Sequence, residues 1–289
     1  MHIIKAPCKI NISLDITSKR EDGYHLIESL FHTVNLYDII SIEKSDKYSI
    51  HTNGMFALKD DEEDNIVTKV FNYFKNEMGL IDNYNINIEK NIPTGAGLGG
   101  GSSDAANIIK FFLSELNIDI NDSLIESFSR FGADIPFFIR GGLAWVSGIG
   151  EKIKNYNFIL PYNIILIYPN IHVSTKLAYS KFVKDDFNKS DIFAIKNMLD
   201  NGEGFNKDIN FNDIVSNTYN IFEKNVFNLD KRIEDIKLHA ENIIKRKVSM
   251  SGSGSSLFAL YENNDKKIDD DFNKLKSEMN YNIYKLSLI

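Results

Sequence analysis

Five glycines lie within seven residues in the segment PTGAGLGGGSSDAA (residues 93–106), between a predicted strand and a predicted helix. An ordinary connecting loop seldom has so many, because glycine loses much backbone entropy on folding. Glycines let backbone N–H groups converge on one point, and the following helix adds the positive end of its dipole. The segment therefore predicts a binding loop for an anion, most often a phosphate. The structural alternative is a flexible turn.

Known phosphate loops with simple signatures fit this segment poorly. It contains G-x-G-x-x-G from Gly95 to Gly100, but no acidic residue ends a next strand about 20 residues later, as dinucleotide binding requires. A Walker A loop has lysine where this chain has Gly101, and the H-R-D and D-F-G signatures of protein kinases are missing. With no lysine in the loop, we expect backbone amides, the helix end and a metal to meet the phosphate charge.

Alternation of apolar and polar residues predicts the strands. Over Ile10–Thr17 it indicates a strand with one buried face, with Lys9 and Asn11 together on the polar side and Cys8 in the core. We expect Tyr48–His51 to pair with Ile39–Glu43 through a short turn. The other expected strands are Tyr84–Glu89, Gly142–Val146, Ile164–Ile167, Lys247–Met250, Leu257–Tyr261 and Tyr281–Leu288.

Helical periodicity predicts the remaining elements. The helix after the glycine loop has Ser102, Ser103 and Asp104 as expected cap residues. Its apolar side consists of Ala105, Ile108, Ile109, Phe112 and Leu116. Further helices are expected after the acidic stretch Asp60–Asn65, and over Asp122–Phe131, Ser174–Phe182, Asp191–Leu199, Leu229–Lys245 and Lys266–Met279. Strands and helices mix without strict alternation, which favours an α+β fold.

Length and composition limit the remaining possibilities. The pattern loosens around Tyr156–Tyr162 in a chain of 289 residues, which predicts two domains, 1–155 and 156–289. The net charge of -7 argues against broad binding of nucleic acid or anionic membrane. A single cysteine forbids an internal disulfide, and no apolar run reaches the roughly 18 residues of a membrane span. We expect a cytoplasmic protein that is a monomer or a weak homodimer.

Three motifs in order resemble the GHMP kinase superfamily. They are APCKINISLDI in the first strand, PTGAGLGGGSSDAA, and SMSGSGSSLFAL (Ser249–Leu260). Together with KINISLDITSKREDGYHLIESLF and FGADIPFF, they resemble the 4-diphosphocytidyl-2-C-methyl-D-erythritol kinase family within it. The similarity runs to about Glu151 and returns at Tyr168–Tyr179 and Ser249–Tyr261, while Asp185–Lys245 shows little that matches. The resemblance implies a two-domain fold with the active site in the cleft between the domains.

The resemblance also implies residue roles. Asp134 would take the proton from the hydroxyl that attacks the γ-phosphate of ATP, and Lys9 beside it would stabilise the transferring group. Without the resemblance, Asp134 is an ordinary helix N-cap and Lys9 a solvated edge lysine. ATP would lie against the glycine loop and Asn65. These ATP-binding residues are Asn65, Pro93, Thr94, Gly95, Ala96, Gly97, Leu98, Gly99, Gly100, Gly101, Ser102, Ser103 and Asp104.

For the acceptor, a small molecule that carries cytidine diphosphate on methylerythritol, the resemblance implies five residues. Tyr24 would stack on the base, His25 would bind its edge, and Tyr179 would lie on its other face. Asn11 and Thr175 would contact the methylerythritol and diphosphate portions. Mg²⁺ is expected with ATP, but the chain shows no recognisable set of ligands for it.

Three other functions stay open at this point. Another GHMP kinase, of the homoserine or mevalonate type, would share the glycine loop but lack the cytidine site. A regulatory ligand sensor would keep the fold with the Lys9 and Asp134 pair damaged, and both residues are present. A nicotinamide oxidoreductase is the remaining interpretation of the glycines.

Overall fold

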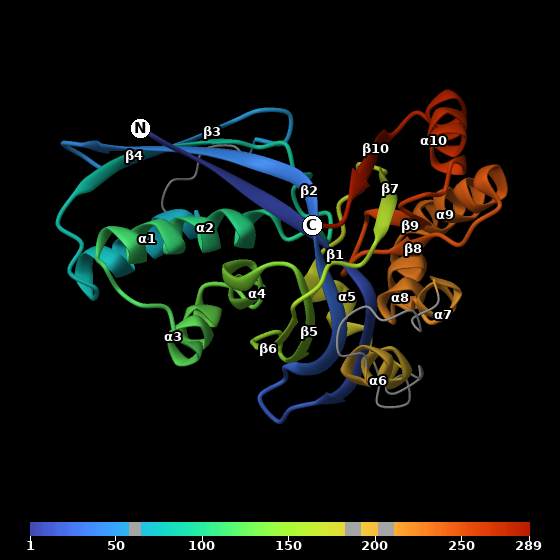
Figure 1. Ribbon diagram of the computed structural model, residues 1–289, viewed down its shortest axis with the longest axis horizontal. Helices are drawn as coiled ribbons and strands as arrows, with labels where there is room; N and C mark the ends of the chain where they lie inside the picture. Colours follow the sequence, from blue (N-terminus) through green and yellow to red (C-terminus); the bar gives the residue numbers. More distant parts are fainter. Residues whose placement is uncertain (58–64, 183–191, 202–210) are drawn as a thin grey trace.

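The computed structural model describes residues 1–57, 65–182, 192–201 and 211–289. It consists of a six-stranded sheet and a four-stranded sheet, each covered by helices (Figure 1). The helix N-terminal to the glycine loop begins at Ile66 as expected, but Asp60–Asp64 of the acidic stretch lie outside the described residues, as does Asp191. The division of the chain at residues 155 and 156 stays a prediction.

The six-stranded sheet is built around one long strand. Its strands are β1 His2–Lys19, β2 His25–Ser45, β3 Ser49–Asn53, β4 Asn83–Glu89, β5 Leu143–Gly148 and β6 Lys152–Tyr156. β1 pairs with β2 along nearly its whole length, while β4 and β5 pair with different parts of β2. The N–H of Lys9 in β1 donates to the carbonyl of Leu98 (3.0 Å), which joins the N-terminal motif to the glycine loop.

The expected pairing of Tyr48–His51 with Ile39–Glu43 is wrong. β4 pairs with that part of β2 instead, and β3 pairs in parallel with the outer side of β4. β4 presents three fully buried apolar side chains, whereas β3 has Ile50 alone. The strand with more surface to bury takes the inner position, and the short one stays at the edge.

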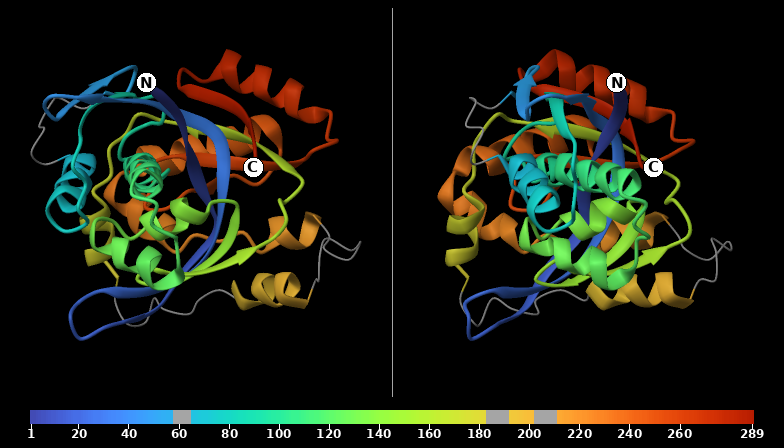
Figure 2. Two further views of the ribbon diagram at one scale, coloured as in Figure 1. Left: turned by 60° about the vertical axis from the view of Figure 1, so that its left-hand side comes forward. Right: turned by 90° about the vertical axis from the view of Figure 1, so that its left-hand side faces the viewer.

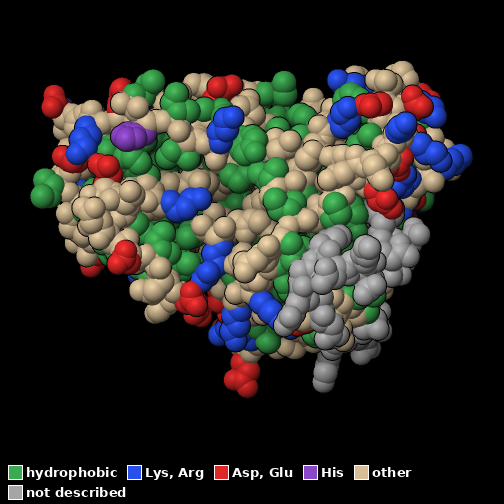
Figure 3. All heavy atoms as spheres, in the orientation of Figure 1, with side chains coloured by type: hydrophobic (Ala, Val, Ile, Leu, Met, Phe, Trp, Pro, Cys, Tyr) green, Lys and Arg blue, Asp and Glu red, His purple; other side chains and the backbone are tan. Residues whose placement is uncertain are grey.

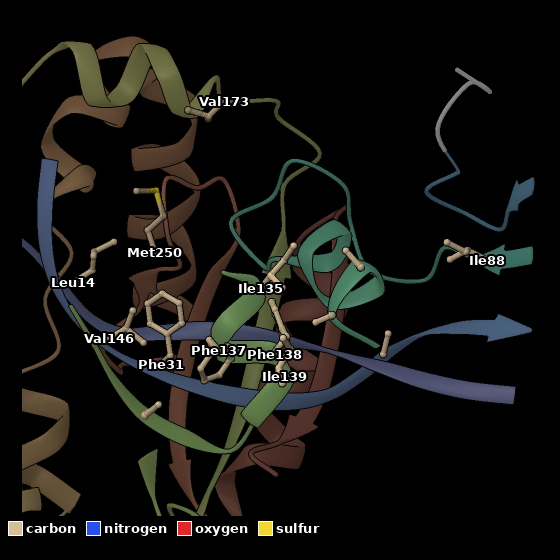
Figure 4. Packing of buried hydrophobic residues seen from close by; sticks show 14 of the residues in the cluster. Leu14, Phe31, Ile88, Ile135, Phe137, Phe138, Ile139, Val146, Val173 and Met250 are labelled. Atoms are coloured by element: carbon tan, nitrogen blue, oxygen red, sulfur yellow. The ribbon is translucent and has the colours of Figure 1, made fainter. Parts of the chain in front are cut away.

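Helices α1 to α4 cover one face of this sheet (Figure 2). Their bounds, with one 3-10 turn, are α1 Ile66–Asn76, α2 Gly100–Glu115, α3 Asp122–Ser127, η1 Phe128–Arg130 and α4 Ile135–Arg140. Figure 4 shows Phe31 of β2 beside Phe137 and Phe138 of α4, and the rings of Phe31 and Phe137 meet edge to face. This packing fixes the start of α4 against the central strands.

The second sheet has the order β10-β7-β9-β8 and carries helices α5 to α10. The strands are β7 Tyr162–Tyr168, β8 Ser249–Met250, β9 Leu257–Glu262 and β10 Asn282–Ser287. The helices are α5 Thr175–Ser180, α6 Ile192–Asn201, α7 Phe211–Ser216, α8 Phe222–Leu229, α9 Lys231–Ile244 and α10 Lys267–Glu278. Acidic and basic side chains intermix over α9 and α10 (Figure 3). The sequence analysis gives no prediction for β6, α7 or α8, and for α4 it gives only the N-cap Asp134.

The expectation of one buried face for the first strand is also wrong, because both faces are covered. Asn11, Ser13 and Asp15 are only 0–2% exposed. Leu14 donates its N–H to the carbonyl of Tyr219 (2.7 Å) and accepts from the N–H of Ile221 (3.0 Å), which places a segment before α8 against β1. The polar residues of β1 therefore face protein and cavity, not bulk water.

A buried histidine predicts a pH dependence of stability. The His32 ring accepts a hydrogen bond from the N–H of Leu160 (3.2 Å) at Nε2, and Nδ1 lies 3.0 Å from the carbonyl of Thr33. This arrangement requires the neutral ring, and burial lowers the pKa of His32 to about 4. The unfolded chain binds the proton near pH 6.5, so the free energy of unfolding should fall by up to about 3 kcal/mol between pH 6.5 and pH 4.

Urea unfolding at a series of pH values measures this effect. His32→Gln should flatten the pH dependence in that window, whereas His51→Gln, on an exposed residue, should leave it as in the wild type. Parallel curves for the His32 variant and the wild type would refute the assignment.

Candidate active site

A cavity of about 1130 Å³ is lined by residues from both the six-stranded half and the four-stranded half of the chain. Of the residues singled out from the sequence, it is lined by Lys9, Asn11, Tyr24, His25, Asn65, Pro93, Thr94, Gly95, Ala96, Gly97, Gly99, Gly100, Gly101, Ser102, Asp104, Asp134, Thr175 and Tyr179. Leu98 and Ser103 do not line it, and both are buried in the protein. The lining extends from Lys9 to Ser253, so residues up to 244 positions apart in sequence share one cavity.

Lys9 points from β1 into the protein and is 4% exposed. Its ammonium donates to the side-chain oxygen of Asn11 (2.5 Å), lies 4.4 Å above the Phe31 ring, and is 3.7 Å from Oδ2 of Asp134. Burial lowers the pKa of Lys9, and the Asp134 carboxylate opposes that shift. A cation is therefore held at a fixed point in the cavity wall.

Asp134 is the accessible member of this pair. It occupies the N-cap position of α4, followed by Pro136, yet its side chain makes no capping hydrogen bond. The carboxyl group is 28% exposed and lines the cavity. A carboxylate that is turned away from its helix and toward a lysine is arranged to accept a proton from a bound hydroxyl.

The two glycine-rich motifs pack backbone against backbone. Gly97 has a φ of +78°, and a Cβ there would lie 2.1 Å from the carbonyl oxygen of Ser251. The Ser251 hydroxyl donates to the Gly97 carbonyl (3.0 Å) and accepts from the N–H of Asn11 (3.2 Å). All three motifs therefore meet at one point.

Gly99 brings the loop against the reacting pair. A Cβ on Gly99 would lie 2.7 Å from the Phe138 ring of α4 and 3.4 Å from Cε of Lys9. Its backbone is left-handed and forms the N-cap of α2 without a side-chain cap bond. The expectation that Ser102, Ser103 and Asp104 cap this helix is wrong, because all three already lie inside its first turns.

The aromatic residues form a looser group. Tyr24 is 60% exposed, while the rings of His25 and Tyr179 lie 5.3 Å apart. Tyr179 also packs edge-on against Phe222, and burial raises its pKa. Tyr24, His25 and Tyr179 all line the cavity, but it is His25 that lies against Tyr179 here.

Thr175 and Asn65 are far apart in the sequence but line the same cavity. The Thr175 hydroxyl is 2.8 Å from that of Ser253, in the second glycine-rich motif. Asn65 caps α1, accepting from the N–H of Val67 (2.9 Å). The ordinary helix-start interpretation of Asn65 is therefore correct, and it is compatible with contact to a ligand.

Sequence reasoning missed a buried charge cluster at the base of the glycine loop. Lys90 donates to Asp104 (2.5 Å) and to Asp38, with side chains 0–5% exposed. For Lys90, the two carboxylates outweigh burial and raise the pKa, whereas burial raises the pKa of Asp104 to about 7. A signal existed: Lys90 continues the alternation that buries Ile86 and Ile88.

Comparison with known proteins gives the family. Residues 65–142 match the family described as GHMP kinases N terminal domain. A 4-diphosphocytidyl-2-C-methyl-D-erythritol kinase of Persephonella marina is 38% identical over 261 residues, covering 90% of this chain and 91% of the relative. The kinase of the same name from Clostridium acetobutylicum is 34% identical, with 96% of each chain covered. This chain belongs to the 4-diphosphocytidyl-2-C-methyl-D-erythritol kinase family.

Solved structures agree with this family and its fold. A crystal structure of 4-(cytidine 5'-diphospho)-2C-methyl-D-erythritol kinase superposes with a TM-score of 0.76 at 28% identity, covering 99% of both chains. A homoserine kinase from Cytophaga hutchinsonii has a TM-score of 0.68 at 19% identity, covering 99% of this chain and 93% of its own, which is a likeness of fold. The α+β GHMP kinase fold is thereby confirmed, and the chain is an ATP-dependent kinase of a small molecule.

Among the described residues, no three His, Cys, Asp or Glu side chains cluster as metal ligands would. Of the helices described, none combines the length and the apolar character of a membrane span.

The close packing at Gly97 predicts that a larger residue at this position destabilises the fold. Gly97→Ala must separate the two glycine-rich motifs and adopt a left-handed backbone, so the free energy of unfolding should fall by about 2–4 kcal/mol. Gly101→Ala is the matched control, because a Cβ there meets no atom within 4 Å and lies in helix α2. That variant should be as stable as the wild type or more stable by about 0.5–1 kcal/mol. Urea unfolding without ligands measures both, and equal losses would contradict the packing argument.

Proposed function

We propose that this kinase transfers the γ-phosphoryl group of ATP to the 2-hydroxyl of 4-diphosphocytidyl-2-C-methyl-D-erythritol, in the non-mevalonate route to isoprenoid precursors. The observation that carries the proposal is the 3.7 Å approach of Lys9 Nζ to Asp134 Oδ2 in the wall of the glycine-loop cavity. The named relatives support the choice of acceptor.

In the proposed reaction, Asp134 accepts the proton of the acceptor hydroxyl as its oxygen attacks the γ-phosphorus. A bond forms between that oxygen and phosphorus, the bond to the β-phosphate oxygen breaks, and ADP leaves. Lys9 stays protonated and stabilises the negative charge of the transferring group. Because Lys9 is already fixed by Asn11 and Phe31, it need not reorganise during transfer.

The ATP phosphates are proposed to lie over the start of α2, a helix of 16 residues. The first N–H groups of a helix have no acceptor within the helix itself and point toward an anion bound there. Mg²⁺ is proposed to arrive on these phosphates, where it would neutralise their charge. Mg²⁺ commonly keeps waters and takes only one or two protein oxygens, so a dedicated cage is not required. Ser102 and Asp134 line the cavity, and the Ser102 hydroxyl and the Asp134 carboxylate would each supply an oxygen to the ion.

The cytidine is proposed to bind at the other end of the cavity, between the exposed Tyr24 ring and the pair of His25 and Tyr179. Asn11 and Thr175 would contact the methylerythritol and the diphosphate. Support comes from their shared cavity, and from the 60% exposure of Tyr24, which leaves one face of its ring open for stacking.

Turnover tests the role of Asp134. Asp134→Asn should lower kcat by about 10²–10⁴-fold, because the amide cannot take the proton, while the affinity for a non-hydrolysable ATP analogue stays near that of the wild type. Asp122→Asn is the matched control, since that side chain is 92% exposed and lies outside the cavity wall. ADP release in a coupled assay with the cytidylyl substrate gives the rates. Wild-type turnover by the Asp134 variant would reject the assignment.

Thermal unfolding tests the choice of acceptor. CMP or CDP should raise the midpoint of unfolding, whereas homoserine and mevalonate should not. Tyr24→Ala should weaken CMP binding by about 1–3 kcal/mol and leave binding of the ATP analogue unchanged. Protection by homoserine or mevalonate alone would favour another GHMP kinase. CMP binding without any ADP release from the cytidylyl substrate would favour a ligand sensor.

A further inference from the structure

The buried cluster of Asp38, Lys90 and Asp104 joins three segments around the glycine loop. Asp38 belongs to β2, Lys90 follows the last residue of β4, and Asp104 lies in the second turn of α2. Lys90 Nζ donates to both carboxylates, at 2.5 Å for Asp104. Oδ1 of Asp38 accepts from the N–H groups of Asn91 (2.6 Å) and Ile92 (2.8 Å). The cluster thus holds the residues that enter the loop and the helix that leaves it.

Stability alone does not account for this arrangement. The cluster places two carboxyl groups around one ammonium group where side chains are 0–5% exposed. Buried ion pairs contribute little to folding compared with apolar side chains of similar size. Oδ1 of Asp104 is moreover buried without a hydrogen-bond partner in the described part of the chain, which costs free energy.

The cluster contacts the phosphate-binding backbone directly. A Cβ on Gly100, the first residue of α2, would lie 3.0 Å from the Ile92 side chain and 3.4 Å from Oδ2 of Asp38. The neighbouring Gly99 abuts Lys9 and Phe138. The junction of loop and helix is therefore held between the reacting pair on one side and the charge cluster on the other.

We propose that Asp38, Lys90 and Asp104 are positioning residues that hold the glycine loop and the start of α2 in the geometry that binds the ATP phosphates. The glycines provide N–H groups but no side-chain contacts of their own to fix them. Preorganised donors bind and stabilise charge better than mobile ones, so loss of the cluster lowers affinity for ATP. The cytidine end of the cavity is not held by the cluster and keeps its affinity. The inference relies on the proposed function only in taking ATP as the ligand of the loop.

Substitution of Asp104 gives the clearest test of this inference. Asp104→Leu leaves Lys90 and Asp38 as a neutral pair, so the protein should fold. Its affinity for the β,γ-imido analogue of ATP should fall at least tenfold, with CMP affinity within twofold of the wild type. Asp104→Asn retains an oxygen for Lys90 and should restore analogue affinity to within threefold of the wild type. A role in stability alone would lower the unfolding midpoint of Asp104→Leu and leave analogue affinity unchanged.

The control removes a different charge pair in the double variant Arg246→Met with Asp265→Leu. That pair joins the segment between α9 and β8 to the segment between β9 and α10. Neither residue lines the cavity, so affinity for the ATP analogue should stay as in the wild type. If Asp104→Leu fails to fold, the double variant Lys90→Met with Asp104→Leu is measured, in which Asp38 keeps its two backbone donors.

Calorimetry on the folded variants decides between the outcomes. Wild-type affinity for the analogue in Asp104→Leu, or in the double variant, overturns the inference, as does failure of both to fold. If the wild type binds the ATP analogue but not CMP, the proposed acceptor is refuted. The affinities of the Asp104 variants for the ATP analogue would still test the inference.

Discussion

The burial of one ammonium group organises this structure. A lysine that is 4% exposed is costly unless its charge is met, and here the Asn11 oxygen, the Phe31 ring and the Asp134 carboxylate meet it. These partners come from β1, β2 and the start of α4, so satisfying the charge also fixes three elements. Asp134 keeps 28% of its side chain exposed, so the proton acceptor is open to the cavity while the cation behind it is fixed.

The glycines serve packing as much as binding. At Gly97 and Gly99 a side chain would collide with the protein itself, with the Ser251 carbonyl in one case and the Phe138 ring in the other. At Gly101 a Cβ would meet nothing within 4 Å. Glycine density thus predicts a close approach of backbones as well as a phosphate cradle. The first two positions let the motifs meet, and Gly101 leaves space at the helix end.

Local patterns predicted well what local interactions decide. The alternation in Tyr84–Glu89 and the apolar stripe of α2 gave those elements correctly, within a few residues. The pairing of β3 failed because it depends on competition with a strand 30 residues later, which periodicity does not contain. The cap of α2 failed because a left-handed Gly99 replaces a side-chain cap.

In the candidate site, too, local patterns predict some residues, while others depend on contacts between distant segments. Motifs located Lys9, the glycine loop and Asp134, whose side chains the structure brings to one cavity. Asp38 and Lys90 carry no motif, yet each continues the buried register of its strand, next to Ile40 and Ile88. An acid and a base that both fall at core positions of paired strands indicate a buried ion pair. For the third member, Asp104, the sequence predicts a helix cap, because the pattern does not show that its partner Lys90 lies across the loop.

The two charge clusters differ in ways that suit different tasks. Lys9 and Asp134 are one cation and one anion with the anion accessible, which a proton transfer requires. The second cluster has two carboxyl groups around Lys90, all 0–5% exposed and both hydrogen-bonded to Lys90, which suits holding the loop and the helix in place. Two adjacent residues face the two clusters: Gly99 lies against Lys9 of the first cluster, and Gly100 lies against Asp38 of the second. A shift of the loop–helix junction would therefore move the phosphate site relative to the proton acceptor, which ties the binding of nucleotide to the geometry of transfer.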